Sequence, residues 1–179
     1  MKLLKLFSLL TVLLSFSSFA KSQNPVNFTL PSATDTSHFT LRNANGRFIA
    51  LHFLLKTECP YCLRYTHEYF VKAKTLPDVV QVFIKPDTES EIKEWANKLD
   101  VTDKIEYSIY RDEDAKLATQ YGIPGGYAFH EQTVHYPALI LLNSDGKEVF
   151  RYIGKNNSDR FSFENLVTKI NELSLINKK

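Results

Sequence analysis

The chain has 179 residues, of which 44% are apolar and 13% aromatic, and its formal net charge is +2. This length and apolar fraction are sufficient for one buried core, so we expect a single compact domain. Two of the 22 basic residues and none of the 20 acidic ones lie within residues 1–20, so the rest of the chain is neutral. A neutral chain lacks the electrostatic footprint of a nucleic-acid or anionic-lipid binder, and nucleic acid is not expected as a partner.

The amino terminus has the layout of a secretory signal peptide. Lys2 and Lys5 precede an apolar run over residues 6–14, and the segment ends in small residues at Ser18 and Ala20. We therefore predict a leader over residues 1–20, cleavage after Ala20, and an exported product that is soluble in the periplasm or another extracytoplasmic space. The alternative is an uncleaved membrane anchor, for which the apolar run is short. The remaining residues, 21–179, form the predicted single domain.

The first part of the mature chain alternates strand and helix patterns. Residues 47–55 are almost continuously apolar, which is typical of a central strand covered on both faces. A helix with apolar residues at helical spacing follows directly. The predicted strands are 26–30, 38–41, 47–55 and 79–84, and the predicted helices are 60–74 and 90–99.

The second part continues this alternation and ends in a hairpin and a helix. The turn Asn143-Ser144-Asp145-Gly146 separates two strand patterns and predicts a hairpin. Residues 123–134 form a loop that is long for a compact domain, so we interpret it as a functional loop. The predicted strands are 105–110, 138–142 and 148–153, and the predicted helices are 112–121 and 161–173. Strands alternating with helices imply a mostly parallel sheet.

The chain has only two cysteines, in the motif Cys59-Pro60-Tyr61-Cys62. The motif lies between a buried strand and a helix, which places the first sulfur near the free backbone N–H groups and the positive end of the helix dipole. That setting lowers the pKa of a thiol. We therefore predict that Cys59 is the nucleophile of a redox-active dithiol and that Cys62 resolves the mixed disulfide.

Two other interpretations of the cysteine pair remain open at this point. A plain structural disulfide would close so short a loop that it would add little stability. A zinc site would need His130 and His135 as further ligands, and these lie far from Cys62 along the chain compared with compact zinc modules.

With these motifs the chain resembles the thioredoxin superfamily, and within it the exported redoxins of the TlpA/ResA type that border the AhpC/TSA peroxiredoxin family. The resemblance rests on the CxxC after a strand and on the segments 28–31, 121–123 and 136–146. It implies a thioredoxin fold, an α/β architecture with a central mixed sheet flanked by helices and an N-terminal redoxin-type extension. It also implies thiol-disulfide oxidoreductase activity on disulfide-containing proteins or small disulfides, with a membrane redox partner. The disulfide of Cys59 and Cys62 would itself be the redox centre, and the resemblance implies no bound cofactor.

The resemblance also implies a substrate-binding groove beside the cysteines. In this family the residue matching Pro137 has a cis peptide bond, which would leave the carbonyl and amide of Tyr136 free to bind a substrate backbone. Tyr61, between the cysteines, is a further candidate substrate-binding residue. The Pro-Tyr dipeptide is typical of glutaredoxins and suggests a middling reduction potential.

Two further resemblances give alternative functions. Segments 29–31 and 110–122 also resemble peroxiredoxins, whose peroxidatic cysteine would correspond to Cys62. In that family a threonine stands at the position of Cys59 and an arginine lies near the position of Tyr136, and this chain has neither. Thiol peroxidase activity is therefore a minor alternative. The SCO copper chaperones share the fold and carry a histidine at the position of His135. Two thiolates and one imidazole, from Cys59, Cys62 and His135, would suit copper.

Two residues near the motif are candidates for proton transfer. His52 lies in the strand that leads to the motif and could pass a proton to Cys62, although a hydrogen-bonded core histidine is the simpler interpretation. Glu58 adjoins the nucleophile and would raise its pKa if it lay close, whereas a solvated carboxylate is the default.

Overall fold

The structure is a computed structural model that describes residues 27–56, 59–99, 108–129 and 132–176. The predicted leader, residues 1–20, lies outside these ranges, as does Glu58. Within the described ranges, no helix is both long and apolar enough to cross a membrane.

A five-stranded sheet in the order β5-β4-β3-β8-β9 forms the centre of the fold. The parallel strands are β3 (Phe48–Phe53), β4 (Val79–Lys85) and β5 (Ile109–Arg111). The hairpin of β8 (Ala138–Asn143) and β9 (Glu148–Ile153) adds to the other side of β3 in antiparallel orientation. The sheet is therefore mixed, as the family resemblance implied, and not mostly parallel as the alternation of elements suggested.

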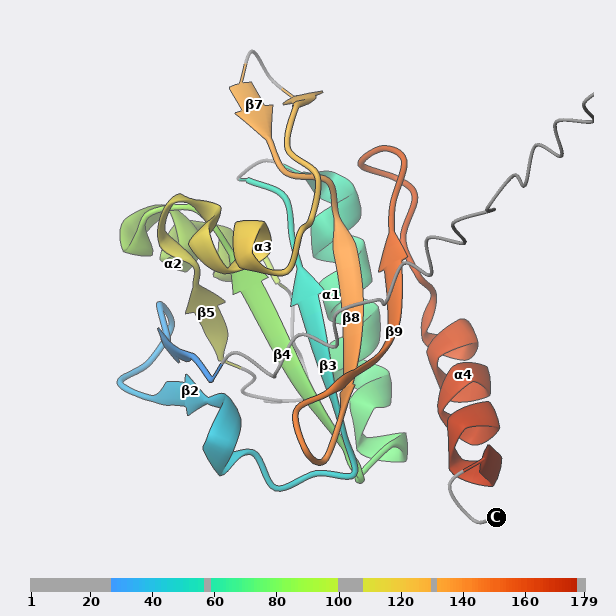
Figure 1. Cartoon of the computed structure of the whole chain (residues 1–179). Coiled ribbons are helices and arrows are strands. Elements are labelled where there is room, and N and C mark those ends of the chain that lie inside the picture. The colour runs from blue at the N-terminus through green and yellow to red at the C-terminus, as the bar shows by residue number, and fades with distance from the viewer. Residues whose placement is uncertain (1–26, 57–58, 100–107, 130–131, 177–179) are drawn as a thin grey trace, which may run out of the picture.

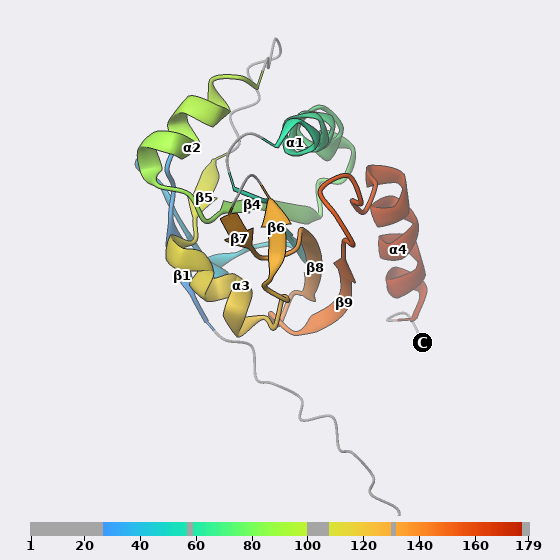
Figure 2. The same ribbon diagram turned by 90° about the horizontal axis from the view of Figure 1, so that it is seen from above.

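Helices cover one face of the sheet, and a mixed layer covers the other (Figures 1 and 2). The core on the first face includes residues of α1 (Pro60–Lys72), α2 (Glu89–Ala96) and α4 (Phe163–Ile176). The core on the second face includes residues of the hairpin β1 (Thr29–Pro31)–β2 (His38–Thr40) and of α3 (Lys116–Gln120). This arrangement confirms the predicted thioredoxin-like α/β fold with an N-terminal extension.

The central strand β3 explains why the sheet is buried on both faces. All six of its residues are buried. Phe48 and Ala50 belong to the core under the helices, while Ile49, Leu51 and Phe53 belong to the core on the other face. Because successive side chains of a strand point to opposite faces, a continuous apolar run fills both cores. Each fully buried large apolar side chain contributes about 1.5–3 kcal/mol.

Several boundaries differ from the predictions. The predicted loop 123–134 contains a small antiparallel hairpin, β6 (Tyr127–Phe129) with β7 (Gln132–Val134). The strand predicted over 105–110 is described only from residue 108, and β5 starts at Ile109. Short 3₁₀ turns flank the regular elements at Leu41–Asn43, Ala73–Thr75 and Glu113–Ala115.

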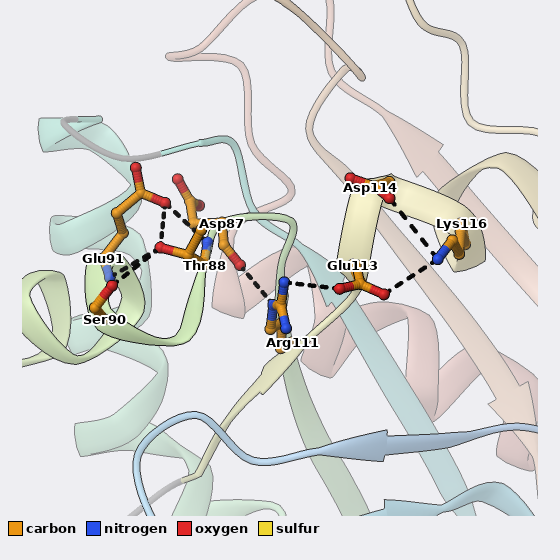
Figure 3. A network of polar contacts seen from close by, with 8 residues as sticks. All are labelled: Asp87, Thr88, Ser90, Glu91, Arg111, Glu113, Asp114 and Lys116. Carbon is orange, nitrogen blue, oxygen red and sulfur yellow. Dashed lines mark hydrogen bonds and ion pairs between the residues drawn. The ribbon is translucent and has the colours of Figure 1, made fainter.

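A polar network ties the start of α2 to the turn after β5 (Figure 3). Thr88 and Glu91 form a capping box, in which the Thr88 backbone N–H donates to Glu91 Oε2 at 2.8 Å. Arg111 Nε donates to the Asp87 carbonyl at 3.2 Å, and its Nη2 donates to Glu113 at 3.0 Å. The network fixes the loops at the carboxyl ends of β4 and β5, the same edge of the sheet at which β3 leads to the cysteine motif.

Candidate active site

The cysteine motif begins α1, directly after the central strand. Leu54 and Leu55 continue the buried chain beyond β3, and the Leu54 N–H donates to Ile84 O at 2.9 Å. Cys59 is the N-cap of α1, and Pro60 occupies the first helical turn, where its missing N–H costs nothing. The predicted order of strand, CxxC and helix is confirmed.

The two sulfurs lie together in a buried position. Both cysteines are free thiols with 0% exposure. The Cys62 backbone N–H donates to Cys59 Sγ at 3.1 Å, which satisfies one of the N–H groups left free at the start of the helix. The first sulfur thus accepts a hydrogen bond from the backbone at the start of the helix.

Arg160 lies against both sulfurs. Its Nη2 is 3.0 Å from Cys62 Sγ and 3.4 Å from Cys59 Sγ. Its Nε and Nη1 are shut off from solvent and have no hydrogen-bond partner within the described ranges. Arg160 comes from the connection between β9 and α4, where the preceding Asp159 accepts hydrogen bonds from Tyr152 Oη and, at 2.8 Å, from the Lys155 N–H.

The environment separates the pKa values of the two thiols. The pKa of Cys59 is lowered from 9.0 to about 6, chiefly by a hydrogen bond from the Cys62 side chain and further by the Arg160 charge, against the opposing effect of burial. The pKa of Cys62 is raised well above its usual value, first by burial and then by that same hydrogen bond. At neutral pH the arrangement therefore pairs a Cys59 thiolate with a Cys62 thiol.

A second buried cation lies behind the site, and it carries its own counter-ion. Lys85 and Asp87 are both 0% exposed, with Lys85 Nζ 3.2 Å from Asp87 Oδ2. The Lys85 ammonium also donates to Leu55 O at 2.6 Å and lies 4.5 Å from the centre of the Trp95 ring. Its charge acts to lower the pKa of Cys62, but it does not outweigh the effect of burial.

The predicted cis peptide bond at Pro137 is wrong. Within the described residues no peptide bond is cis. The Tyr136 N–H donates to Pro124 O at 2.9 Å, and its carbonyl accepts from His135 Nδ1 at 2.7 Å. Both backbone groups that were expected to bind a substrate are therefore occupied within the chain. A trans X-Pro bond is also favoured intrinsically, by about 0.5–1 kcal/mol.

Pro137 nevertheless lies at the site. Together with Tyr65 and Arg160 it lines a void of about 10 Å³. Tyr61 is 41% exposed on the outer side of the motif, and Arg64 lies over its ring at 5.9 Å. The structure thus places one of the predicted substrate-binding residues against the interior of the site and another at its surface.

His52 is a buried core residue with two hydrogen bonds. Its Nε2 lies 2.7 Å from Gln81 Oε1, and its Nδ1 lies 2.9 Å from Tyr65 Oη. Burial lowers its pKa to about 4, so the ring is neutral. Because Gln81 Oε1 can only accept, Nε2 carries the proton and Nδ1 accepts from the tyrosine hydroxyl. Neither hydrogen bond reaches a sulfur, and the proton-transfer role of His52 stays a prediction.

His135 does not join the cysteine pair. Within the described ranges, no three His, Cys, Asp or Glu side chains are grouped so that they could hold a metal ion, and this includes Cys59, Cys62 and His135. His135 is buried, and burial lowers its pKa. It lines a separate pocket of about 420 Å³, together with Lys56, Thr119 and residues of the loop before β6. The donor set of the copper alternative is therefore not assembled in this structure.

Sequence comparison identifies the family. The AhpC/TSA family matches residues 22–149, which is more than half of the chain. The chain belongs to the AhpC/TSA family. A comparison of this AhpC/TSA member with curated protein sequences found no match.

Solved structures with the same fold include both peroxiredoxins and thioredoxin-like proteins. A cysteine-mutant peroxiredoxin 6 from Arenicola marina has a TM-score of 0.75 at 17% identity, with 88% of this chain and 74% of that chain covered. The exposed lipoprotein thioredoxin Etrx1 from Streptococcus pneumoniae has a TM-score of 0.63 at 20% identity, with coverages of 82% and 98%. A protein from Bacteroides thetaiotaomicron described as a putative protein disulfide isomerase has a TM-score of 0.59 at 20% identity, with coverages of 84% and 87%. The AhpC/TSA member is thus a redoxin with a CxxC pair.

Sequence reasoning missed Arg160 in this AhpC/TSA protein. The residue lies 98 and 101 positions from the two cysteines, in a turn segment between the last strand and the last helix. Nothing in the local pattern distinguishes it from a solvated arginine. A signal exists only at the level of the fold, because β9 runs back toward the carboxyl end of β3 and the connection after it ends beside α1.

Proposed function

We propose that this redoxin is a thiol-disulfide oxidoreductase that exchanges electrons through Cys59 and Cys62. The observation that carries the proposal is the asymmetry of the pair. Cys59 accepts hydrogen bonds and has a pKa lowered to about 6, whereas the pKa of the Cys62 thiol is raised. A nucleophile and a resolving thiol need this division, because the thiolate is the attacking species and the second thiol acts only after the mixed disulfide forms.

In the reducing direction, the Cys59 thiolate attacks one sulfur of a substrate disulfide. A mixed disulfide forms, and the other substrate sulfur leaves as a thiolate that takes up a proton. Cys62 then loses its proton and attacks Cys59 Sγ, which closes the Cys59–Cys62 disulfide and releases the second substrate thiol. Two electrons pass from the pair to the substrate. No cofactor enters the cycle, because the disulfide is itself the redox centre.

Access to the sulfurs requires a movement. Cys59 is 0% exposed, so a protein disulfide cannot reach its sulfur in this conformation. Arg160 is in contact with both sulfurs and Tyr61 is exposed beside them. We infer that substrate binding displaces side chains at this end of α1 before the attack.

The predicted substrates and location follow from the same proposal. The leader over residues 1–20 supports export, and an oxidising extracytoplasmic space supplies protein and small-molecule disulfides. We propose that a membrane redox partner restores the pair after each cycle.

The test is the reduction of insulin disulfides by the wild type and the two cysteine variants, with dithiothreitol as the electron source. Cys59→Ser is expected to reduce the rate to that of dithiothreitol alone. Cys62→Ser is expected to lose turnover but to accumulate a mixed disulfide. If Cys59→Ser reduced insulin as fast as the wild type, the assignment of Cys59 as the nucleophile would be wrong.

A second candidate function is the reduction of peroxides, and one observation favours it. The sequence lacked an arginine near Tyr136, but the fold brings Arg160 Nη2 to 3.4 Å from Cys59 Sγ. A cation there can stabilise the oxygen that leaves when the Cys59 thiolate attacks a peroxide. Cys59, whose pKa is lowered, and not Cys62, the position that the resemblance to peroxiredoxins indicated, would become a sulfenic acid with release of water or an alcohol. Cys62 would then condense with it to the disulfide and a second water.

Peroxide consumption in the presence of dithiothreitol separates the two candidates. A peroxidase would consume hydrogen peroxide faster than dithiothreitol does alone, and Arg160→Met would abolish the gain. A wild type that reduces insulin without accelerating peroxide loss would leave disulfide exchange as the function.

A further inference from the structure

The Arg160 guanidinium is a half-buried charge whose hydrogen bonds go to sulfur. Its Nη2 contacts Cys62 Sγ and Cys59 Sγ, while Nε and Nη1 have no partner in the described part of the chain. Asp159, the preceding residue, interacts electrostatically with Arg160, and its side chain accepts hydrogen bonds from Tyr152 Oη and the Lys155 N–H. Lys85 differs, because its ammonium is balanced by Asp87 at 3.2 Å. The Cys59 thiolate is thus a negative charge in direct contact with Arg160, and Asp159 also interacts with the Arg160 charge.

The contact between Arg160 and Cys59 distinguishes the two redox states of the pair. In the dithiol state the Cys59 thiolate faces the guanidinium, and the attraction between the two charges offsets part of the cost of burying both. In the disulfide state both sulfurs are neutral, and the guanidinium keeps its desolvation cost but loses the attraction of the thiolate, while the Asp159 carboxylate is the same in both states. The contact consequently stabilises the dithiol relative to the disulfide.

We propose that Arg160 raises the reduction potential of the Cys59–Cys62 pair, so that the pair takes electrons from the dithiols of other proteins. The inference rests on the proposed function, because it names the direction of exchange at the same two sulfurs. A dithiol form that is stabilised corresponds to a disulfide form that accepts electrons readily. It places the reduction potential above the middling value that the Pro-Tyr dipeptide suggested.

The oxidising step balances as follows. A substrate thiolate attacks Cys59 Sγ of the disulfide, the Cys59–Cys62 bond breaks, and Cys62 leaves as a thiolate that takes up a proton. The second substrate thiol then loses its proton and attacks the substrate sulfur of the mixed disulfide. Cys59 is released as the thiolate that Arg160 stabilises, and the substrate leaves with a disulfide after giving two electrons to the pair. A disulfide-bearing redox partner restores the oxidised form.

The expected shift of the dithiol–disulfide equilibrium follows from the lowered pKa of Cys59. A pKa of about 6 in place of 9.0 stabilises the dithiol at pH 7 by about tenfold in equilibrium constant. Arg160 is one of several causes, so its loss is expected to change the constant by about threefold. At 29.6 mV per tenfold change, this corresponds to a reduction potential lower by about 15 mV.

The test is equilibration with mixtures of reduced and oxidised glutathione, which gives the dithiol–disulfide constant of each variant. Arg160→Met is expected to shift the constant about threefold toward the disulfide. Arg160→Lys keeps the charge and is expected to lie closer to the wild type. Arg42→Met removes an exposed arginine far from the motif and serves as the matched control, with a wild-type constant.

Two results would overturn the proposal. One is a constant for Arg160→Met within twofold of the wild type, or shifted toward the dithiol. The other is an Arg160→Lys constant equal to that of Arg160→Met, since shape rather than charge would then be responsible. Either result leaves the proposed function intact if the wild type still exchanges disulfides, whereas a wild type that never equilibrates with glutathione would refute the proposed function itself.

A measurement on the wild type covers the case in which Arg160→Met fails to fold. Urea unfolding compares the oxidised and the reduced protein directly. If the folded environment favours the dithiol, the reduced form is the more stable of the two. An oxidised form more stable than the reduced form would contradict the proposal without any substitution.

Discussion

At the scale of single residues, two chemically identical thiols acquire opposite tendencies to ionise from their positions on α1. Cys59 is the N-cap and accepts the Cys62 N–H at 3.1 Å, whereas Cys62 lies one turn further into the core. Burial disfavours a thiolate at both positions, but only Cys59 receives enough donors to outweigh it. The division of roles is thus a property of the helix start and not of the dipeptide between the cysteines.

Substitution of Cys62 tests which donor matters most for Cys59. The Cys62 side chain is the largest cause of the lowered pKa, so Cys62→Ala is expected to raise the pKa of Cys59 above about 6. Cys62→Ser keeps a hydroxyl donor and is expected to retain most of the lowering. Thiolate absorbance against pH gives both values, with the thiolate present above the pKa and lost as the pH falls through it. Equal midpoints in the two variants would show that the side-chain donor has no effect.

His52 gives the protein an expected acid sensitivity. Its folded pKa of about 4 lies below the value of 6.5, so protonation favours the unfolded state. The contribution of neutral His52 to the free energy of unfolding is fully present above pH 6.5. It falls by about 3 kcal/mol as the pH decreases toward 4, at about 1.36 kcal/mol per pKa unit. Urea unfolding as a function of pH measures this loss, and His52→Gln is expected to flatten the profile in that window.

His67→Gln is the matched control for His52→Gln, because His67 is exposed on α1 and its loss removes an imidazole without touching the core. This variant is expected to keep the wild-type slope. A His52→Gln profile as steep as that of the wild type would mean that other groups cause the acid sensitivity.

The residues of the site differ in how far sequence could predict them. Cys59 and Cys62 are recognisable because their function depends on a local spacing at a helix start. Arg160 is not, because its function depends on where the chain returns after β9. The backbone contacts of Tyr136 were not predictable for a related reason, since its N–H donates to Pro124, a partner that local sequence does not reveal.

At the scale of elements, the connection from β9 to α4 holds Arg160 in place. The Gly154 N–H donates to Pro137 O at 2.8 Å, and a Cβ at Gly154 would lie 2.2 Å from Asp159 O and 2.9 Å from Pro137 Cγ. The absence of a side chain at this position therefore lets the turn close beside the site.

Gly154→Ala is expected to push the turn that carries Arg160 away from the sulfurs. Overpacking of this kind costs about 1–3 kcal/mol, and the pKa of Cys59 should rise as the guanidinium withdraws. Thermal unfolding and thiolate titration measure the two effects. Gly125→Ala is the control, because a Cβ there meets no atom within 4 Å. A Gly154→Ala protein with wild-type stability and pKa would show that the turn is not tightly held.

The end of β4 contributes a buried ion pair to the packing of α2. Asp87→Asn would leave the Lys85 ammonium, which is 0% exposed, without its counter-charge and is expected to cost about 3–5 kcal/mol. The exposed pair of Lys93 with Glu89 offers a contrast, since Lys93→Ala should cost less than about 1 kcal/mol. Urea unfolding of the two variants compares them. Equal losses would contradict the assignment of Lys85 and Asp87 as a coupled buried pair.

Sequence patterns predicted the elements best where one physical signal dominates. The apolar run of β3 and the turn residues between β8 and β9 placed those strands within a few residues. The hairpin of β6 and β7 was interpreted as loop, because its strands have only three residues each and are too short to show periodicity.

At the scale of the whole molecule, the mixed sheet explains how distant segments meet at one point. The central strand β3 leads to α1. The antiparallel hairpin of β8 and β9 lies in the same sheet and leads to α4. The fold class was predictable because alternation and the CxxC position agree with one known architecture. The position of Arg160 beside the sulfurs was not predictable, because it depends on the register of the whole sheet.

The most direct test of the central claim is to locate the mixed disulfide. The chain has only two cysteines, so oxidised glutathione can form an adduct at either Cys59 or Cys62 in the matching single-serine variant. Mass spectrometry is expected to show a glutathione adduct on Cys59 in Cys62→Ser at neutral pH, and much slower modification of Cys62 in Cys59→Ser. Faster adduct formation at Cys62 than at Cys59 would contradict the account.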